Sequence, residues 1–517
     1  MGATVLQLDK PAASRADQAA RSVLIGLLCS LAAFICMHGA AGSVADPDAG
    51  WHLRTAEWIL QHRALPHVDP FSRTTGGSPW QAYSWLFELI LLKAYGWMHL
   101  RGLLVFTAAM MTLISAALYR MMSRLQSDFM SCAVLNLIVI FCLSGLMTPR
   151  PWLFTILFFV IELDILMHAR REGTTRELWL LLPLFALWAN IHIQFVDGLL
   201  VLGLAAIEPL VERWWKSNVR GVGARPLWLA LGGSLLAVCV NPYGFAIYKI
   251  AWSLGSQSGV LNTVSEMGAM KFRSPQDFLL LFLALAAAGV LFRYRRLNPF
   301  ETMLLAMAAV LSFRSSRDLW IIVIAASAIL AAGLPVRASR ETHEKRPLWA
   351  PAFAVLTGAA AFAASVFFVQ TDNAALQKRL AERMPVQAVQ FVKDHHYNGA
   401  LFNTYDWGGY LIWNLREPVS IDGRAALYGD QAISRSAATW GGGPQWAADP
   451  DLASAGVVIG PAGAALTQLL RNDARFTLAY EDKVAAVFVA REKSKAAGQA
   501  SPNGSPVAHE QQNPLPR

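Results

Sequence analysis

The chain has 517 residues, of which 55% are hydrophobic and only 15% are charged, and its formal net charge is +9. A soluble protein of this length carries about a quarter charged residues, so this composition argues against a soluble enzyme and for an integral membrane protein. The basic residues lie in short clusters between apolar runs, and no nucleic-acid-binding motif occurs, which excludes nucleic acid as a partner. The five cysteines all lie in apolar runs without a CxxC pair, so neither disulfides nor a zinc site is expected.

The N-terminus predicts a cytoplasmic tail, residues 1–20, followed by a first apolar run over residues 22–42. That run is long enough to span a bilayer, although Ser43-Val44-Ala45 also fits the end of a cleaved signal peptide. Under either interpretation Asp46 lies outside the cytoplasm. Further runs predict about eleven transmembrane helices in all; they cover residues 101–121, 130–148, 151–168, 177–190, 194–211, 227–248, 277–292, 299–313, 319–335 and 348–369.

Basic clusters follow alternate apolar runs, and this pattern predicts which side each connection faces. Lys and Arg concentrate in cytoplasmic loops, so the N-terminus is expected in the cytoplasm, with residues 43–100 and 249–276 as long exported loops of a multi-pass protein of the bacterial inner membrane. The clusters are Arg120 with Arg124, residues 168–171, residues 213–225, residues 293–296 and residues 337–346.

The transmembrane domain is predicted to cover residues 21–369, and the sequence then changes character. Residues 370–492 predict a small exported α/β domain, and residues 493–517, rich in Ser, Pro, Gln and Asn, predict a disordered tail. Helices are expected over 374–396, 406–415 and 464–471, and strands over 400–402, 418–421, 455–459 and 485–490. The expected fold class is therefore an α-helical polytopic membrane protein with a C-terminal α/β domain.

With these sides assigned, the polar residues at the ends of the spans all map to the exported face. Charged groups in or near hydrocarbon are costly and normally pair or line a cavity, so their common side predicts one water-filled cavity that opens outward. The residues are Asp46, Asp48, His52, Arg54, Arg150, Asn190, His192, Gln194, Asp197, Asn241, Arg314 and Arg317.

Each of these residues also has a purely structural interpretation. Asp48 fits the N-cap of a helix that starts near Ala49, although two carboxylates within three residues are more than a cap requires. The arginines fit interfacial anchors, and Asn190 and His192 fit hydrogen bonds between helices.

An outward cavity at membrane depth suits a lipid-linked substrate. A carboxylate can act as a general base toward an acceptor, and arginines can neutralise a phosphate leaving group. The sequence contains no Walker A, GxSxG or HExxH motif. The energy must then come from an activated substrate, and a polyprenyl-phosphate-linked sugar is the expected donor.

The first apolar run is followed by an acidic loop in which Asp48 precedes Trp51-His52-Leu53-Arg54. In this arrangement the chain resembles the GT-C membrane glycosyltransferases, which use polyprenyl-linked donors. The stretch is similar to the acidic first loop of oligosaccharyltransferases, and this resemblance implies Asp48 as the catalytic residue, with Asp46 second. Thr263-Val-Ser-Glu266 is similar to an acceptor-side SVSE segment. The stretch Thr404–Tyr410 is similar to the acceptor-recognition motif WWDYG in scrambled order, and its structural alternative is an aromatic helix start.

Two departures from the family limit what the resemblance implies. Oligosaccharyltransferases carry a second acidic motif on which metal binding depends, whereas this junction reads Met147-Thr-Pro-Arg-Pro-Trp152, without an acid. No cofactor is therefore expected, although a divalent ion held by Asp46, Asp48 and Glu266 is an alternative. The imperfect WWDYG match leaves the acceptor open among glycans, lipids and proteins.

The expected roles follow from position and resemblance together. Asp48 would act as base with Asp46 in support, and Arg150 with Arg314 or Arg317 would hold the polyprenyl phosphate. The remaining candidates would bind the sugar or the acceptor: His52, Arg54, Asn190, His192, Glu266, Asp406 and Trp407. Two other functions compete with transfer, namely a transporter or flippase for a lipid-linked sugar and a non-catalytic membrane subunit of a polysaccharide-export complex.

Overall fold

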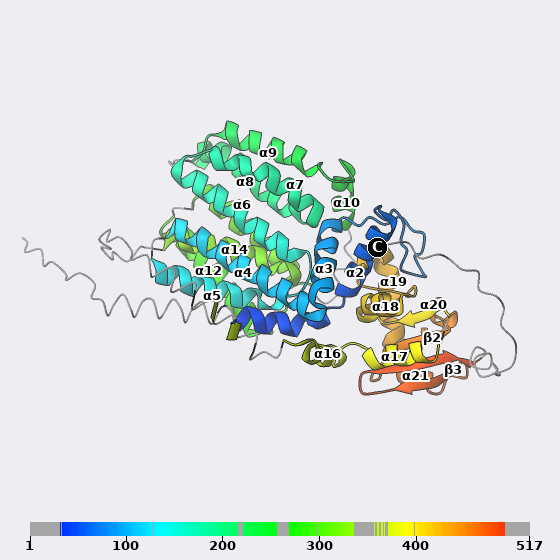
Figure 1. The fold of residues 1–517 in the computed structure, drawn as a ribbon. Coiled ribbons are helices and arrows are strands. Elements are labelled where there is room, and N and C mark those ends of the chain that lie inside the picture. Colours follow the sequence, from blue (N-terminus) through cyan, green and yellow to red (C-terminus); the bar gives the residue numbers. More distant parts are fainter. Residues whose placement is uncertain are drawn as a thin grey trace, which may run out of the picture.

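The computed structural model describes residues 34–126, 128–215, 221–255, 268–295, 297–334, 371–397 and 399–491, with Ala32 and single residues between 356 and 367. Most of these residues form a helical bundle, and a smaller α/β domain lies beside one end of it (Figure 1). The helices of the bundle are α4 (Leu100–Leu125), α5 (Phe129–Leu143), α6 (Trp152–Glu172), α7 (Leu181–Ile191), α8 (Phe195–Trp215), α9 (Ala224–Val238), α10 (Ala246–Gly255), α12 (Pro275–Arg293), α13 (Pro299–Arg314) and α14 (Leu319–Gly333).

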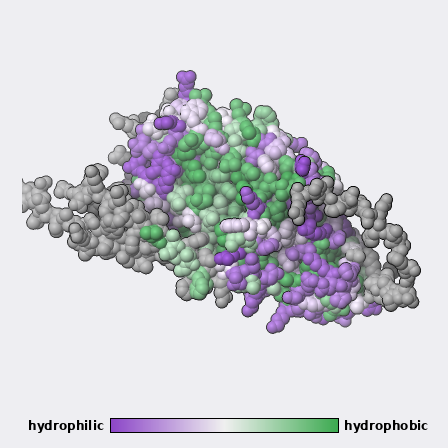
Figure 2. All heavy atoms as spheres, in the orientation of Figure 1, coloured by the Kyte–Doolittle hydropathy of each residue, from purple (hydrophilic) through white to green (hydrophobic). Residues whose placement is uncertain are grey.

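The bundle has the dimensions and the surface of a membrane protein. Within the described part of the chain, five helices are long and apolar enough to cross a bilayer. Figure 2 shows a hydrophobic band over the bundle, with hydrophilic surface at its far end and over the C-terminal domain. The predicted class, a polytopic α-helical membrane protein with an α/β region, is confirmed. The count of about eleven spans stays a prediction, because residues 22–42 and 348–369 fall largely outside the described residues.

The two ends of the bundle carry different polar groups. Arg124 at the end of α4 bonds Asp164 and Glu177, each at 3.0 Å, and Arg171 at the end of α6 donates to the carbonyl of Arg124 at 2.8 Å. Arg150 precedes α6 and therefore lies at the other end of that helix. The structure thus separates the basic residues at the ends of α4 and α6 from Arg150, while the side of the membrane that each end faces stays a prediction.

One predicted span is two helices. The apolar run over residues 227–248 breaks between α9 and α10, where the side chain of Asn241 donates to the carbonyl of Val238 at 2.6 Å and accepts from the N–H of Tyr243 at 2.7 Å. Pro242 offers no N–H to continue a helix, and Gly244 takes a positive φ of 53°, which glycine adopts without strain. The break agrees with the prediction that Asn241 lies at the end of a span, whereas the apolar run itself continues into α10.

The first long loop forms two helices, α2 (Ala49–His62) and α3 (Trp85–Met98), with an irregular segment between them. That segment reaches the C-terminal domain, where the N–H of Val419 donates to Phe71 at 3.1 Å and the N–H of Arg73 donates to Val419 at 2.8 Å. The predicted strand over residues 418–421 therefore does not join the domain's sheet. It forms an isolated bridge to Ser72 instead, because its backbone groups are used by this loop.

The C-terminal domain is built on one four-stranded sheet of order β1-β2-β4-β3. Strands β1 (Leu401–Asn403) and β2 (Val457–Pro461) pair in parallel, and β4 (Ala485–Ala490) pairs antiparallel with β2 and with β3 (Phe476–Glu481). The helix expected over residues 374–396 is interrupted before Pro385, and β3 and α19 were not predicted. The helices are α16 (Asn373–Ala381), α17 (Val386–Asp394), α18 (Gly408–Leu415), α19 (Ala425–Trp440), α20 (Pro450–Ala453) and α21 (Ala465–Leu470).

Glycines allow the domain to pack directly on the first loop. A Cβ on Gly50 of α2 would overlap the carbonyl oxygen of Gly409 in α18, and a Cβ on Gly409 would overlap the carbonyl oxygen of Pro47. The two backbones therefore touch where α18 crosses the start of α2. This contact holds the domain against the segment that carries Asp46 and Asp48.

Candidate functional site

A cavity of about 1500 Å³ lies where the bundle, the first loop and the C-terminal domain meet. Its wall combines residues from α2 and α3, the turns before α6, α8 and α14, helix α10, and residues 404–440 of the C-terminal domain. The structure therefore brings together groups separated by hundreds of positions in the chain. Seven of the predicted site residues line this wall: Asp48, His52, Arg150, His192, Arg314, Arg317 and Asp406.

Asp46 and Asp48 share one guanidinium group. Nε of Arg150 lies 2.7 Å from Oδ2 of Asp46 and 3.0 Å from its Oδ1, and Nη1 lies 2.9 Å from Oδ2 of Asp48. The N–H of Asp48 also donates to Oδ1 of Asp46 at 2.9 Å. Burial raises the pKa of Asp46 above its usual range, and the charge of Arg150 opposes that effect. Asp46 thus anchors Arg150 behind the wall, and Arg150 in turn holds Asp48.

The side chain of Asp48 does not serve as a helix cap. Asp48 occupies the N-cap position of α2, but its carboxylate makes no capping hydrogen bond. Its Oδ1 instead accepts from Nε1 of Trp51 at 3.1 Å, while Oδ2 faces Arg150. The structural alternative for this residue therefore does not account for its carboxylate, which lines the cavity.

Arg150 was expected to hold the polyprenyl phosphate, but its guanidinium group already pairs with Asp46 and Asp48. This group also lies 4.7 Å from the centre of the Trp152 ring. A buried cation that already pairs with two carboxylates has little charge left for a phosphate. Arg150 is therefore better placed to position Asp48 than to bind a leaving group.

The turn between α13 and α14 supplies two other cations. Among the described residues, no carboxylate lies within ion-pair distance of Arg314 or Arg317. Arg317 lies 5.1 Å from the centre of the Trp152 ring, and its Nε is buried without a hydrogen bond. The turn is held in place because the N–H of Ser316 donates to the carbonyl of Gly268 at 2.9 Å. These guanidinium groups are available to an anion in the cavity.

Two buried histidines, His52 and His192, are also among the predicted residues that line the cavity. Nδ1 of His52 lies 3.3 Å from Oε1 of Glu88, and Nδ1 of His192 lies 2.8 Å from the hydroxyl of Thr155. Burial holds the pKa of both rings well below the usual range, and nearby arginines add to the effect. Both side chains are therefore neutral hydrogen-bonding groups.

Two of the predicted residues make structural contacts instead. Nη1 of Arg54 pairs with Glu57, which also accepts from Arg416 of the C-terminal domain at 3.0 Å. Asn190 accepts from Nε1 of Trp85 at 3.1 Å and donates to the carbonyl of Val240 at 2.7 Å. Neither residue lines the cavity.

Of the remaining two predicted residues, one is buried away from the cavity and the other lies outside the described part of the chain. Trp407 is buried in the C-terminal domain, where Nε1 donates to the carbonyl of Arg383 at 3.1 Å. Its position matches the structural alternative for the aromatic motif, a helix start packed on the domain core. Glu266 lies outside the described residues, so its role stays a prediction.

Sequence reasoning missed a buried ion network that joins the first loop to the C-terminal domain. Arg424 donates to Asp69 and to Asp422, each at 2.7 Å, and lies 4.8 Å from the centre of the Trp80 ring. Tyr428 donates to the same Asp422 at 2.5 Å. Arg424 also lines the cavity, so this network fixes the wall that the domain contributes.

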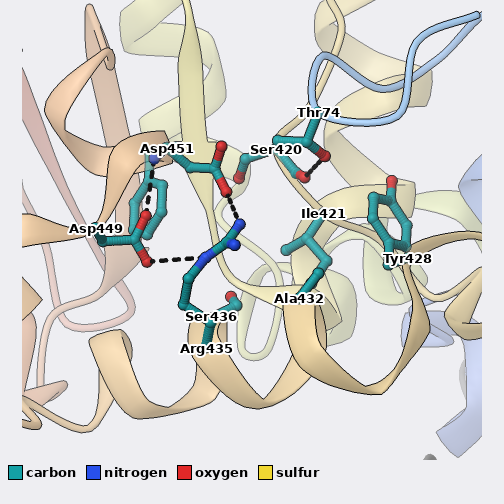
Figure 3. A pocket seen from close by; sticks show the side chains of 10 residues that line it. Thr74, Ser420, Ile421, Tyr428, Ala432, Arg435, Ser436, Asp449 and Asp451 are labelled. Atoms are coloured by element: carbon teal, nitrogen blue, oxygen red, sulfur yellow. Dashed lines mark hydrogen bonds and ion pairs between the residues drawn. The ribbon is translucent and has the colours of Figure 1, made fainter.

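A second contact between the loop and the domain lies close by. The hydroxyl of Thr74 donates to the carbonyl of Ser420 at 2.7 Å, beside a small pocket in which Arg435 reaches Asp449 and Asp451 (Figure 3). The pocket has a volume of about 10 Å³, which is room for one water molecule. The contact of Thr74 with Ser420 therefore joins the first loop to the C-terminal domain, and the pocket beside it offers no space for a substrate.

Removal of Arg424 should destabilise the junction strongly. The Arg424→Ala variant would leave Asp69 and Asp422 buried without their cation, at a cost of about 3–5 kcal/mol. We expect a lower thermal unfolding temperature and earlier proteolytic release of the C-terminal domain. The control is Arg475→Ala, which removes a partly exposed pair with Asp473 and should cost less than about 1 kcal/mol. Equal stability of the two variants would contradict the role of the network.

The described residues contain no group of three or more His, Cys, Asp or Glu side chains that could hold a metal ion. The alternative metal site of Asp46, Asp48 and Glu266 includes one residue, Glu266, that lies outside the described part of the chain. For the two aspartates the competing partner is visible, because Arg150 already bonds both carboxylates.

No protein-family model matches the sequence, and no curated protein matches it. Among solved structures, ArnT from Cupriavidus metallidurans bound to undecaprenyl phosphate is similar, with 12% identity, a TM-score of 0.45, and coverage of 92% of this chain and 98% of that one. The apo form of the same ArnT gives 12% identity, a TM-score of 0.47, and coverage of 94% and 100%.

Proposed function

We propose that this protein is a glycosyltransferase that moves a sugar from a polyprenyl-phosphate-linked donor to an acceptor at the outer face of the inner membrane. One observation carries the proposal: a single large cavity at one end of an apolar bundle combines an aspartate with two guanidinium groups that have no carboxylate partner among the described residues. A lipid-linked substrate would place its charged head group at this depth and its chain in the bilayer.

The phosphate of the donor would bind at Arg314 and Arg317. A guanidinium group forms paired, charge-assisted hydrogen bonds with phosphate oxygens, and these two lie on the turn before α14, where their charge is not cancelled by an ion pair within the described chain. They would stabilise the negative charge that develops on the departing phosphate. Arg150, which was expected to share this role, would position Asp48 instead.

Asp48 would act as the general base. The acceptor hydroxyl or amide would pass its proton to the carboxylate of Asp48 as its oxygen or nitrogen attacks C1 of the sugar. The bond from C1 to the phosphate oxygen would break, and the polyprenyl phosphate would leave with the electron pair. Asp46 would support Asp48 through Arg150, and Asp406 on the opposing domain would contact the acceptor.

This proposal needs no metal ion. Arg150 supplies positive charge to both carboxylates. The acceptor would approach from the C-terminal domain, which would face the periplasm, and the donor from the bilayer. Membrane lipids and a glycan, lipid or protein acceptor are the partners that this arrangement implies.

Substitution of Arg317 should weaken lipid binding. The Arg317→Gln variant removes a charge-assisted contact, and we expect about tenfold weaker binding of undecaprenyl phosphate to the purified protein in lipid nanodiscs. Arg54→Gln is the matched control, because Arg54 lies outside the cavity and should leave binding unchanged. The assignment fails if both variants bind as tightly as the wild type.

Mass spectrometry of lipid-linked sugars and glycoconjugates tests the function as a whole. Cells that lack the protein, or that contain only its Asp48→Asn variant, should accumulate one polyprenyl-phosphate sugar and lose one glycoconjugate. Unchanged lipid and glycan profiles would exclude transfer. A flippase would instead move the lipid-linked sugar across the bilayer without changing its bond to phosphate, so accumulation on the cytoplasmic side alone would favour that function.

A further inference from the structure

Glu88 is a buried carboxylate for which the proposed reaction has no role. It lies in α3, is 1% exposed, and was not singled out by the sequence. Its Oε1 lies 3.3 Å from Nδ1 of His52, whereas its Oε2 is buried without any hydrogen bond. Glu88 also lines the cavity, and a buried carboxyl group with an oxygen left unbonded is costly enough to call for a functional explanation.

The contact with Glu88 fixes how the ring of His52 faces the cavity. The ring packs on Trp51, with centroids 3.5 Å apart, and meets Phe87 edge-on at 5.0 Å. Nδ1 is used by Glu88, and Nε2 has no hydrogen-bond partner among the described residues. Because His52 lines the cavity, Nε2 is the nitrogen available to a ligand.

The charges around the pair argue against an ionic role. Burial, together with the charges of Arg150, Arg424 and Arg317, holds the pKa of His52 well below its usual range. Burial raises the pKa of Glu88 well above its own usual range. The pair is therefore neutral, with one hydrogen shared between Nδ1 and Oε1. Nε2 then offers either an N–H or a lone pair, according to the tautomer. A hydroxyl group, which both donates and accepts, is the ligand group that fits either case.

We propose that Nε2 of His52 binds a hydroxyl group of the transferred sugar, and that Glu88 is the positioning residue that holds the ring for this contact. This inference rests on the proposed function and deepens it, because it names a hydroxyl group of the sugar as the part of the donor that His52 binds. His52 lies one helical turn after Asp48 on the same face of α2. A sugar bound there would lie beside the proposed base.

Binding of lipids with and without a sugar tests the inference. The probes are undecaprenyl phosphate and the same lipid carrying glucose, galactose, mannose or arabinose, measured by native mass spectrometry with the full-length protein in nanodiscs. Wild type should bind at least one sugar-bearing probe about tenfold more tightly than the bare lipid. Glu88→Leu, which fills the space without a hydrogen bond, should lose this increment, and Glu88→Gln, which can donate to or accept from Nδ1, should keep it.

Each outcome has a distinct meaning. An increment that persists in Glu88→Leu overturns the positioning role of Glu88. An increment that is absent from wild type for every sugar overturns the hydroxyl site while leaving the lipid site intact. Loss of the increment in both Glu88→Leu and Glu88→Gln overturns the positioning role. If wild type does not bind undecaprenyl phosphate at all, the proposed function itself fails and this inference fails with it.

Discussion

The Asp48→Asn variant is expected to lose transfer activity by at least about a hundredfold while it inserts and folds normally. Loss of a general base typically costs 10²–10⁴-fold in rate. The amide oxygen can still accept from Nε1 of Trp51, as Oδ1 of Asp48 does at 3.1 Å. Its NH₂ group, however, cannot accept from Arg150 or take a proton from the acceptor. Activity is measured as transfer from the lipid-linked sugar that accumulates in cells without the protein.

The control for this variant is Asp430→Asn, which makes the same chemical change at an exposed position of the C-terminal domain. It should keep full activity. Both variants should elute as the wild type does in size-exclusion chromatography and unfold at a similar temperature. An Asp48→Asn protein with normal turnover would remove Asp48 from the reaction.

The second large effect is expected from Gly423→Ala. A Cβ at this position would overlap Oδ1 of Asp48 and would lie close to both oxygens of the carboxylate. Only the end of a side chain has to move, so the domain should still fold. Asp48 would then be displaced from Trp51 and Arg150, and displacement of a catalytic group by about 1 Å can cost a hundredfold in rate. We expect a fall in kcat of about tenfold to a hundredfold, measured in the same transfer assay.

Gly463→Ala is the matched control, because a Cβ there would meet no atom within 4 Å. The comparison separates the effect of crowding Asp48 from the general effect of an added methyl group in the C-terminal domain. Normal activity of Gly423→Ala would mean that this domain does not shape the position of the base.

The sequence could predict that the site residues lie close together, because charged side chains are costly in hydrocarbon and collect at the ends of the spans. Arg150, His192 and Arg317 follow or precede apolar runs on one predicted side, and the structure brings all three to one cavity. Arg54 was misplaced for a reason the sequence contains. It lies six residues after Asp48, which at 3.6 residues per turn points its side chain about 120° away from that of Asp48 around α2. His52, four residues after Asp48, lies on the same side.

Pairing between distant residues could not be predicted. The sequence predicts that Arg150 and Asp48 lie on one side of the membrane, but it does not predict which carboxylate Arg150 pairs with. Arg424 and Asp69 are 355 positions apart, and only the docked domain explains why both are buried. Glu88 offered one usable signal, a single carboxylate inside the apolar stretch Leu86-Phe-Glu-Leu-Ile90. Such a group is costly unless it has a partner or a task.

A cryo-EM structure of the protein in nanodiscs with undecaprenyl phosphate tests the central claim most directly. We predict density for the phosphate within hydrogen-bond distance of Arg314 or Arg317, inside the cavity that Asp48 lines, with the lipid chain leaving toward the bilayer. Phosphate density outside this cavity, or a cavity that stays empty while the lipid binds elsewhere, would contradict the account.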